Sequence, residues 1–207
     1  MFSKIVNKEP IFIKPIQSKK DRLFETIKTQ NNTIYNIKYH QARVNQAYKK
    51  HFNTAPKFEL SSILKATANL NKIKVIYDKN GICDIAYTPY KPKKIEKLML
   101  IDISGFEYNY KYLDRAMFEH IYSMYKDIDE FILLNNGYIT DATISNIALY
   151  NEKMKQWHSP TKTLLNGTYR EKLIDEKKLK LTQIDYTNLK NYSKIALLNA
   201  MVGFRVL

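Results

Sequence analysis

The sequence FILLNNGYITDATISNIALY, residues 131–150, carries the clearest structural pattern in the chain. Its first four residues form a short apolar run that is typical of a buried strand. Asn136-Gly137 is a strong turn signal, and residues 138–150 predict a second strand. This stretch therefore predicts a hairpin and antiparallel pairing.

Two polar residues, Asp141 and Asn146, interrupt this otherwise apolar predicted strand. A buried carboxylate needs a cationic partner, because burying an unpaired charge is costly. Asp141 is therefore either buried beside a cation or left in water after the turn, and the pattern favours neither alternative.

Similar patterns extend in both directions from the hairpin. Helical spacing of apolar residues predicts helices over 40–52, 61–70 and 112–126, and residues 165–170 introduce another helix. Alternating or apolar runs predict strands at 23–28, 33–39, 72–77, 82–87, 98–103, 156–158 and 194–198, with a short last strand after a turn at 199–203. Prolines and lysines crowd residues 89–97, which predicts a linker between subdomains 1–88 and 98–207. The expected fold class is α+β, with two small α/β subdomains and mostly antiparallel sheets.

Composition narrows the possible functions. The chain has 207 residues, and its Lys and Arg outnumber its Asp and Glu by 34 to 20. Because these basic residues are scattered and mostly Lys, nucleic-acid binding is disfavoured, whereas a solvated lysine-rich surface or steering of an anionic small substrate fits. A single cysteine, Cys83, excludes an intramolecular disulfide and a cysteine-based zinc site, so we expect no metal site. Since no long apolar run and no signal peptide is recognisable, we expect a cytoplasmic protein with no membrane segment.

Lys111 is the first residue that could carry chemistry. It lies among tyrosines in YNYKYLD, residues 108–114, at the start of a predicted helix that follows the Gly105 loop. Aromatic walls can desolvate a lysine, which lowers its pKa and makes its amine a possible imine-forming nucleophile. The alternative is an ordinary surface lysine.

A possible anion site lies at residues 165–170, LNGTYR. A glycine before a helix lets the first backbone N–H groups point outward together, and with the helix dipole they can bind phosphate. The alternative is an ordinary helix start capped by Asn166. On another predicted helix His40 and Arg43 share a face, and Arg43 could hold phosphate in a bidentate way or pair with a surface acid.

A lysine, an acid and a phosphate-binding turn are together the components of a pyridoxal phosphate site. The lysine forms the imine, the acid keeps the pyridine nitrogen protonated, and the helix N-terminus holds the phosphate.

The order of these motifs resembles the class IV aminotransferase family, the fold-type IV pyridoxal phosphate enzymes with the D-amino acid aminotransferase-like fold. The resemblance runs from about Leu23 to the C-terminus. It includes FETI at 24–27, HQAR at 40–43, the strand with Asp141, the turn at 165–170 and NAM at 199–201. It implies a homodimer and pyridoxal phosphate as cofactor. The residues implied to hold the cofactor are Arg43, Lys111, Asp141, Thr168, Tyr169, Asn199 and Ala200, with Lys111 also catalytic.

Within the family, the pattern KYLDR at 111–115 is most similar to that of aminodeoxychorismate lyases. The resemblance therefore implies a 4-amino-4-deoxychorismate lyase that releases 4-aminobenzoate and pyruvate for folate synthesis. The alternative at the same site is an amino-acid transaminase of the branched-chain or D-amino acid type. A basic binding module and a family member without catalysis are further alternatives.

Overall fold

The computed structural model describes residues 4–207, and its fold is α+β as expected. The chain forms two compact units. The larger contains residues 4–18, Lys93–Asn109 and Arg115–Leu207, and the smaller contains Lys19–Pro92 and Tyr110–Asp114. None of the helices within residues 4–207 is long and apolar enough to cross a membrane.

Two segments fall in a different unit from the one that the contiguous division at 89–97 implies. Residues 4–18 belong to the larger unit, because β1 (Ile11–Phe12) pairs in parallel with β6 (Leu98–Asp102). Residues 110–114 belong to the smaller unit, because Lys111 O accepts a 2.9 Å hydrogen bond from Phe24 N and Tyr112 bridges to Leu23. Both departures come from backbone pairing between segments that are distant in sequence.

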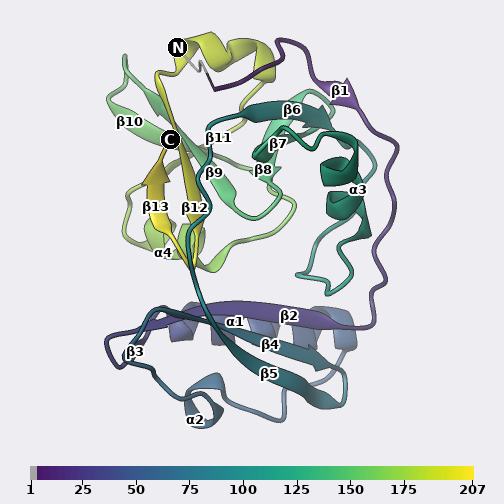
Figure 1. The fold of residues 1–207 in the computed structure, drawn as a ribbon, viewed down its shortest axis with the longest axis vertical. Coiled ribbons are helices and arrows are strands. Elements are labelled where there is room, and N and C mark those ends of the chain that lie inside the picture. The colour runs from purple at the N-terminus through teal and green to yellow at the C-terminus, as the bar shows by residue number, and fades with distance from the viewer. Residues whose placement is uncertain (1–3) are drawn as a thin grey trace. The chain divides into compact units, whose positions relative to one another are not determined.

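The smaller unit is an antiparallel sheet with a helix, α1, along it (Figure 1). The strand order is β3-β2-β4-β5. The strands alternate in burial, so that Leu23 and Ile27 of β2 share a buried face with Val75 of β4. This alternation is what the 2-residue period of a strand requires. The elements are β2 (Leu23–Gln30), β3 (Thr33–Ile34), α1 (Ile37–Ala47), the π-helical turn η1 (Tyr48–Phe52), α2 (Leu60–Ile63), β4 (Asn71–Asp78) and β5 (Gly81–Pro89).

The smaller unit differs from the sequence prediction at two places. The strand predicted over 33–39 stops at Ile34, because Asn36 takes a left-handed conformation, φ 55°, and starts α1. The helix predicted over 61–70 is a single turn, and the backbone at Leu64 is already extended.

The larger unit is built on a sheet that branches at β9. The main path runs β1-β6-β7-β8-β9-β10-β11, and β9 also pairs with β12, which pairs with β13. Pairing is parallel from β1 to β7 and between β10 and β11, and antiparallel elsewhere. The further elements are β7 (Glu130–Asn135), β8 (Tyr138–Ala142), β9 (Asn146–Asn151), β10 (Gln156–Pro160), β11 (Lys180–Thr182), β12 (Lys194–Asn199), β13 (Gly203–Val206), α3 (Ala116–Met124), α4 (Thr168–Asp175) and the 3-10 helix η2 (Tyr186–Asn191).

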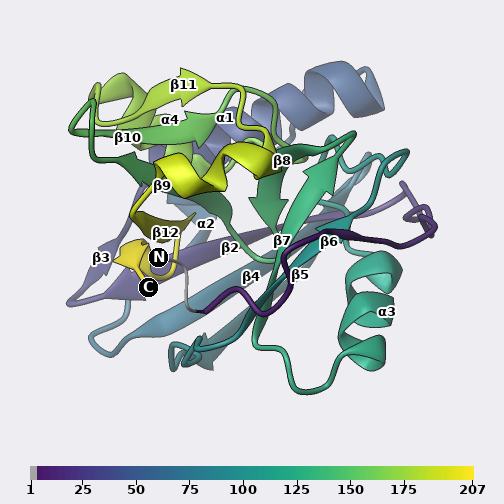
Figure 2. The ribbon, with the colours of Figure 1, turned by 90° about the horizontal axis from the view of Figure 1, so that it is seen from above.

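Opposite faces of β9 and β12 enter different apolar clusters. Ile147 and Leu149 belong to the larger cluster, whereas Ala148 between them packs with Leu173 of α4 in the smaller one. Helix α3 lies on the β6–β7 side of this unit, away from β10 and β11, and the Tyr122 ring packs on Phe131 with centroids 5.0 Å apart (Figure 2).

Two predictions for the larger unit were wrong in detail, and two elements were missed. The strand predicted over 138–150 is two strands, β8 and β9, because residues 143–145 turn and bring Asp141 opposite Asn146. The helix predicted over 112–126 begins only at Ala116, so Lys111 lies in an extended segment rather than at a helix start. Strand β11 and the helix η2 were not predicted.

Candidate active site

Asp141 is the buried acid of the larger unit. Only 4% of its surface is exposed. Its two carboxylate oxygens accept hydrogen bonds from the Asn146 side-chain amide and from Leu164 N. Burial raises the pKa of Asp141 to about 7, although these two donors and the charge of Arg170 act in the opposite direction. Of the two alternatives for Asp141, burial is therefore correct. Its hydrogen-bond donors are neutral N–H groups and not the cation that was expected.

The start of α4 lies directly against this acid. The N-cap is Gly167 with no side-chain cap, so the expectation of an Asn166 cap was wrong. The Asn146 side chain occupies the space where a Cβ on Gly167 would lie, with Asn146 Cγ 3.1 Å from that position. A side chain at position 167 would therefore displace the amide that donates to Asp141. The next residue, Thr168, is buried and begins the helix.

The turn after β12 approaches the same region. Asn199 Oδ1 accepts hydrogen bonds of 2.9 Å from Met201 N and from Val202 N, so the side chain closes its own turn. Asn199 Nδ2 donates to Ile144 O at 3.3 Å, which ties this turn to the β8–β9 connection. The predicted residues Asp141, Thr168, Asn199 and Ala200 thus lie in or next to three turns that are linked by hydrogen bonds or direct packing within the larger unit.

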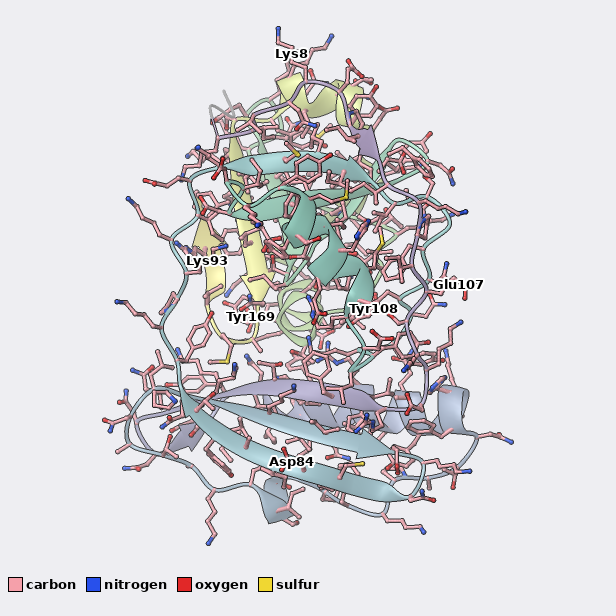
Figure 3. All side chains as sticks on the ribbon, turned by 45° about the vertical axis from the view of Figure 1, so that its right-hand side comes forward. Lys8, Asp84, Lys93, Glu107, Tyr108 and Tyr169 are labelled. Carbon is pink, nitrogen blue, oxygen red and sulfur yellow. The ribbon has the colours of Figure 1, made fainter. Side chains whose placement is uncertain are left out.

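Tyr169 and Arg170 occupy the first turn of α4. The Tyr169 hydroxyl lies 3.4 Å from where a Cβ on Gly203 would stand, so its ring reaches the start of β13. Arg170 is 3% exposed and donates to Ser159 Oγ at 3.1 Å and to Pro160 O at 2.6 Å. The Arg170 guanidinium therefore holds α4 to the end of β10. Figure 3 shows the neighbouring Tyr169.

Lys111 belongs to the smaller unit, beside the start of β2. Its Nζ lies 4.3 Å from the centroid of the Phe24 ring. The aromatic ring that contacts Lys111 thus belongs to a β2 residue that precedes it by 87 positions in the sequence. From the sequence, only the flanking tyrosines were expected to surround it. Contact with a ring face shields one side of the amine from water.

A buried cluster of Glu25, His40 and Arg43 lies in the same unit. Glu25 is fully buried and accepts hydrogen bonds from Arg43 Nε at 2.8 Å and from Arg43 Nη2 at 2.5 Å. His40 Nδ1 lies 2.6 Å from Glu25 Oε2. Burial alone would raise the pKa of Glu25, but the charge of Arg43 and the His40 contact outweigh it and hold the pKa at about 2. Burial lowers the pKa of His40, with a smaller contribution from the charges of Arg43 and Lys111, although the contact with Glu25 acts in the opposite direction.

Arg43 is therefore paired with an acid, and that acid is buried rather than on the surface. The phosphate role of Arg43 stays a prediction. Burial of Glu25 was not predicted, although the sequence contains a signal for it. Strand period places Glu25 on the same face as Leu23 and Ile27, so an acid in this apolar face needs a cation, and HQAR at 40–43 supplies one.

The α+β architecture is that of the fold-type IV pyridoxal phosphate enzymes. The chain belongs to the amino-transferase class IV family, whose sequence model matches residues 22–206. Enzymes of this family depend on pyridoxal phosphate.

The chain is also similar to individual proteins. An uncharacterized protein of Haemophilus influenzae is 31% identical over 186 residues, which cover 87% of this chain and 98% of that protein. A crystal structure from Haemophilus somnus, provisionally called a 4-amino-4-deoxychorismate lyase, is 28% identical with a TM-score of 0.81, over 88% of this chain and 97% of that one. A Thermotoga maritima protein, provisionally called a branched-chain amino acid aminotransferase, shares the fold with a TM-score of 0.72 at 19% identity, over 91% of this chain and 76% of that one.

Proposed function

We propose that this chain binds pyridoxal phosphate and converts 4-amino-4-deoxychorismate into 4-aminobenzoate and pyruvate. The observation that carries the proposal is the meeting of three turns around a buried acid, Asp141, in a chain that also holds Lys111 against an aromatic ring. The similarity to the Haemophilus somnus protein, and the pattern KYLDR at 111–115, favour the lyase within the family.

The donor set around Asp141 fits the cofactor. A buried carboxyl with a pKa of about 7 gains from a protonated ring nitrogen, because the opposite charge offsets the cost of burying the anion. Backbone N–H groups at a helix N-terminus suit a phosphate, so Thr168 and Tyr169 at the start of α4 are the first candidates to hold it, and the turn at Asn199-Ala200 is the second. Ser145 Oγ, in the connection that follows Asp141, is buried with no hydrogen-bond partner among residues 4–207, so it is a further polar group that a bound cofactor could satisfy.

The residues would divide the work as follows. Lys111 would hold the cofactor through Nζ, Asp141 would hold the ring nitrogen, and the two turns would hold the phosphate. Arg43 is proposed as a further phosphate ligand, kept in place by Glu25. When bound, pyridoxal phosphate withdraws electrons from the carbon that bears the substrate's amino group and makes its proton acidic.

Lys111 is the proton carrier in this proposal. Once the substrate's amino group has replaced it on the cofactor, the free Lys111 amine would take the proton from the ring carbon that bears the amino group, and the bond between the neighbouring ring carbon and the ether oxygen would break. The electron pair becomes a ring double bond, so the product is aromatic. A proton that Lys111 returns to the methylene carbon of the departing group completes pyruvate. Formation of the aromatic ring supplies much of the driving force.

The proposed substrate carries two carboxylates, which suits the charge of this chain. The formal net charge is +14, and long side chains that end in nitrogen project outward from both units (Figure 3). Such a surface attracts anions by long-range electrostatics. A cytoplasmic homodimer, as in the family, is part of the proposal.

An amino-acid transaminase is the second candidate, because proteins given that name share the fold. Product analysis separates the two. The purified enzyme loaded with pyridoxal phosphate should release pyruvate from 4-amino-4-deoxychorismate with no amino acceptor present. A stoichiometric requirement for 2-oxoglutarate would overturn the lyase proposal and favour the transaminase.

A further inference from the structure

A second buried acid, Glu130, lies at the start of β7 and has no part in the chemistry above. It is fully buried. Burial raises the pKa of Glu130, although hydrogen bonds from Thr143, Phe131 and Tyr122 act in the opposite direction. An apolar residue would avoid the cost of burying a carboxyl group, so the reason for an acid lies in what it binds.

All the donors converge on one oxygen of Glu130. Oε1 accepts hydrogen bonds from Thr143 Oγ1 at 2.5 Å, Phe131 N at 2.8 Å, Thr143 N at 3.1 Å and Tyr122 OH at 3.2 Å. Oε2 is buried and has no hydrogen-bond partner within residues 4–207. The carboxyl group is thus directed at Thr143, which it binds through both the backbone N–H and the side chain.

Thr143 is held on its other sides as well. Its carbonyl oxygen accepts a 2.8 Å hydrogen bond from Arg115 Nη2, and its hydroxyl lies 2.9 Å from Tyr122 OH. The backbone N–H, the carbonyl and the hydroxyl of this one residue are therefore all bound. A residue that is tied at three polar groups by Glu130, Arg115 and Tyr122 has little freedom to shift.

Thr143 opens the connection that sets the geometry of the acid at the candidate site. Asp141 lies two residues before it, and Asn146, whose amide donates to Asp141, lies three residues after it. Within this connection Ala142 N donates to Ser145 O at 2.8 Å. The distance between the carboxylate and its amide donor therefore depends on where Thr143 is anchored.

We propose that Glu130 is a positioning residue for Asp141, which acts by fixing Thr143 and through it the β8–β9 connection. This inference rests on the proposed function, because it assigns Asp141 to the ring nitrogen of pyridoxal phosphate. Glu130 makes no contact with the cofactor or the substrate in this account.

One threonine in β8 and one directly after it offer a matched pair of variants for the test. Thr140 and Thr143 are both buried, and substitution by valine replaces one hydroxyl by a methyl group in each, with little change in volume. Thr140 Oγ1 donates to Leu133 O at 3.1 Å and does not anchor the connection. Thr143→Val should weaken pyridoxal phosphate binding about tenfold, as expected for contacting residues that are coupled, whereas Thr140→Val should leave it within about twofold. Urea midpoints of the two cofactor-free variants should fall by similar amounts.

Hydrogen exchange of backbone amides reports the same positioning without the cofactor. In cofactor-free Thr143→Val the Ala142 amide should exchange faster than in the wild type, because the connection is loosened, and in Thr140→Val it should not. If Thr143→Val does not fold, Tyr122→Phe removes the hydroxyl that contacts Thr143. It should weaken cofactor binding and speed exchange of the Ala142 amide in the same way, but by less.

The outcomes are distinguishable. Wild-type protein that binds no pyridoxal phosphate refutes the proposed function. Wild-type protein that binds it, with equal weakening by Thr143→Val and Thr140→Val, overturns the role of Glu130 alone. In a Glu130→Leu background Thr143→Val should add little further loss of cofactor affinity, and fully additive losses would also overturn the proposal.

Discussion

Replacing Asp141 by asparagine should remove most of one specific pH dependence of stability in the cofactor-free protein. Burial raises the pKa of this carboxyl from 3.8 to about 7. Between these values the native state binds a proton that the unfolded state has lost, so the free energy of unfolding falls as the pH rises. The shift corresponds to about 4 kcal/mol when it is converted at 1.36 kcal/mol per pKa unit.

The assay is urea unfolding of both proteins without cofactor at intervals from pH 4 to pH 8. The quantity that matters is the free energy of unfolding of the wild type minus that of Asp141→Asn, because His40, Glu25 and Glu130 titrate in both proteins and cancel. Asparagine cannot reproduce both acceptor contacts of the carboxylate, so the difference has an offset. This offset does not depend on pH.

The difference should decrease by about 4 kcal/mol from pH 4 to pH 8. Thr140→Val is the control, and its difference from the wild type should be flat throughout. A flat difference for Asp141→Asn as well would mean that the carboxyl ionises in its ordinary range. The account of Asp141 as a buried acid would then be wrong.

Two further predictions concern close packing and the second ion cluster. Gly167→Ala places a methyl group on the Asn146 side chain and should cost about 1–3 kcal/mol in urea unfolding; an equal loss in an Asn146→Ala background would contradict the steric reason. Glu25→Gln should cost about 3 kcal/mol at pH 7, because Arg43 is left without its buried partner. The pKa of Glu25 is lowered to about 2, so its contribution is present above about pH 4.5 and lost as the pH falls toward 2, and the wild-type advantage should disappear there. An advantage that persists at pH 2 would exclude the ion pair as its source.

Local sequence signals were enough for the hairpins and most central strands. Lys-Asn-Gly at 79–81 and Asn136-Gly137 mark turns, and β4, β5, β6 and β7 lie at the predicted places. Burial of Asp141 and the glycine at the start of α4 were also foreseeable in part, since an acid in an apolar run and a glycine before a helix are visible in the sequence.

The rest depends on contacts between segments that are distant in sequence. Residues 143–145 contain neither glycine nor proline, so no local signal breaks the strand there, and the anchors of Thr143 come from Glu130 and Arg115. The segment around Lys111 has helical spacing but pairs with the start of β2, which is almost 90 residues earlier. Tertiary pairing overrides local propensity at both places.

Lys111 as the point of cofactor attachment is the central claim of this account. The direct measurement is intact and peptide mass spectrometry of the protein after incubation with pyridoxal phosphate and reduction with borohydride. We predict one phosphopyridoxyl group, located at Lys111, and none in the Lys111→Ala protein under the same conditions. An unmodified wild-type protein, or an adduct at another lysine that survives in Lys111→Ala, would contradict it.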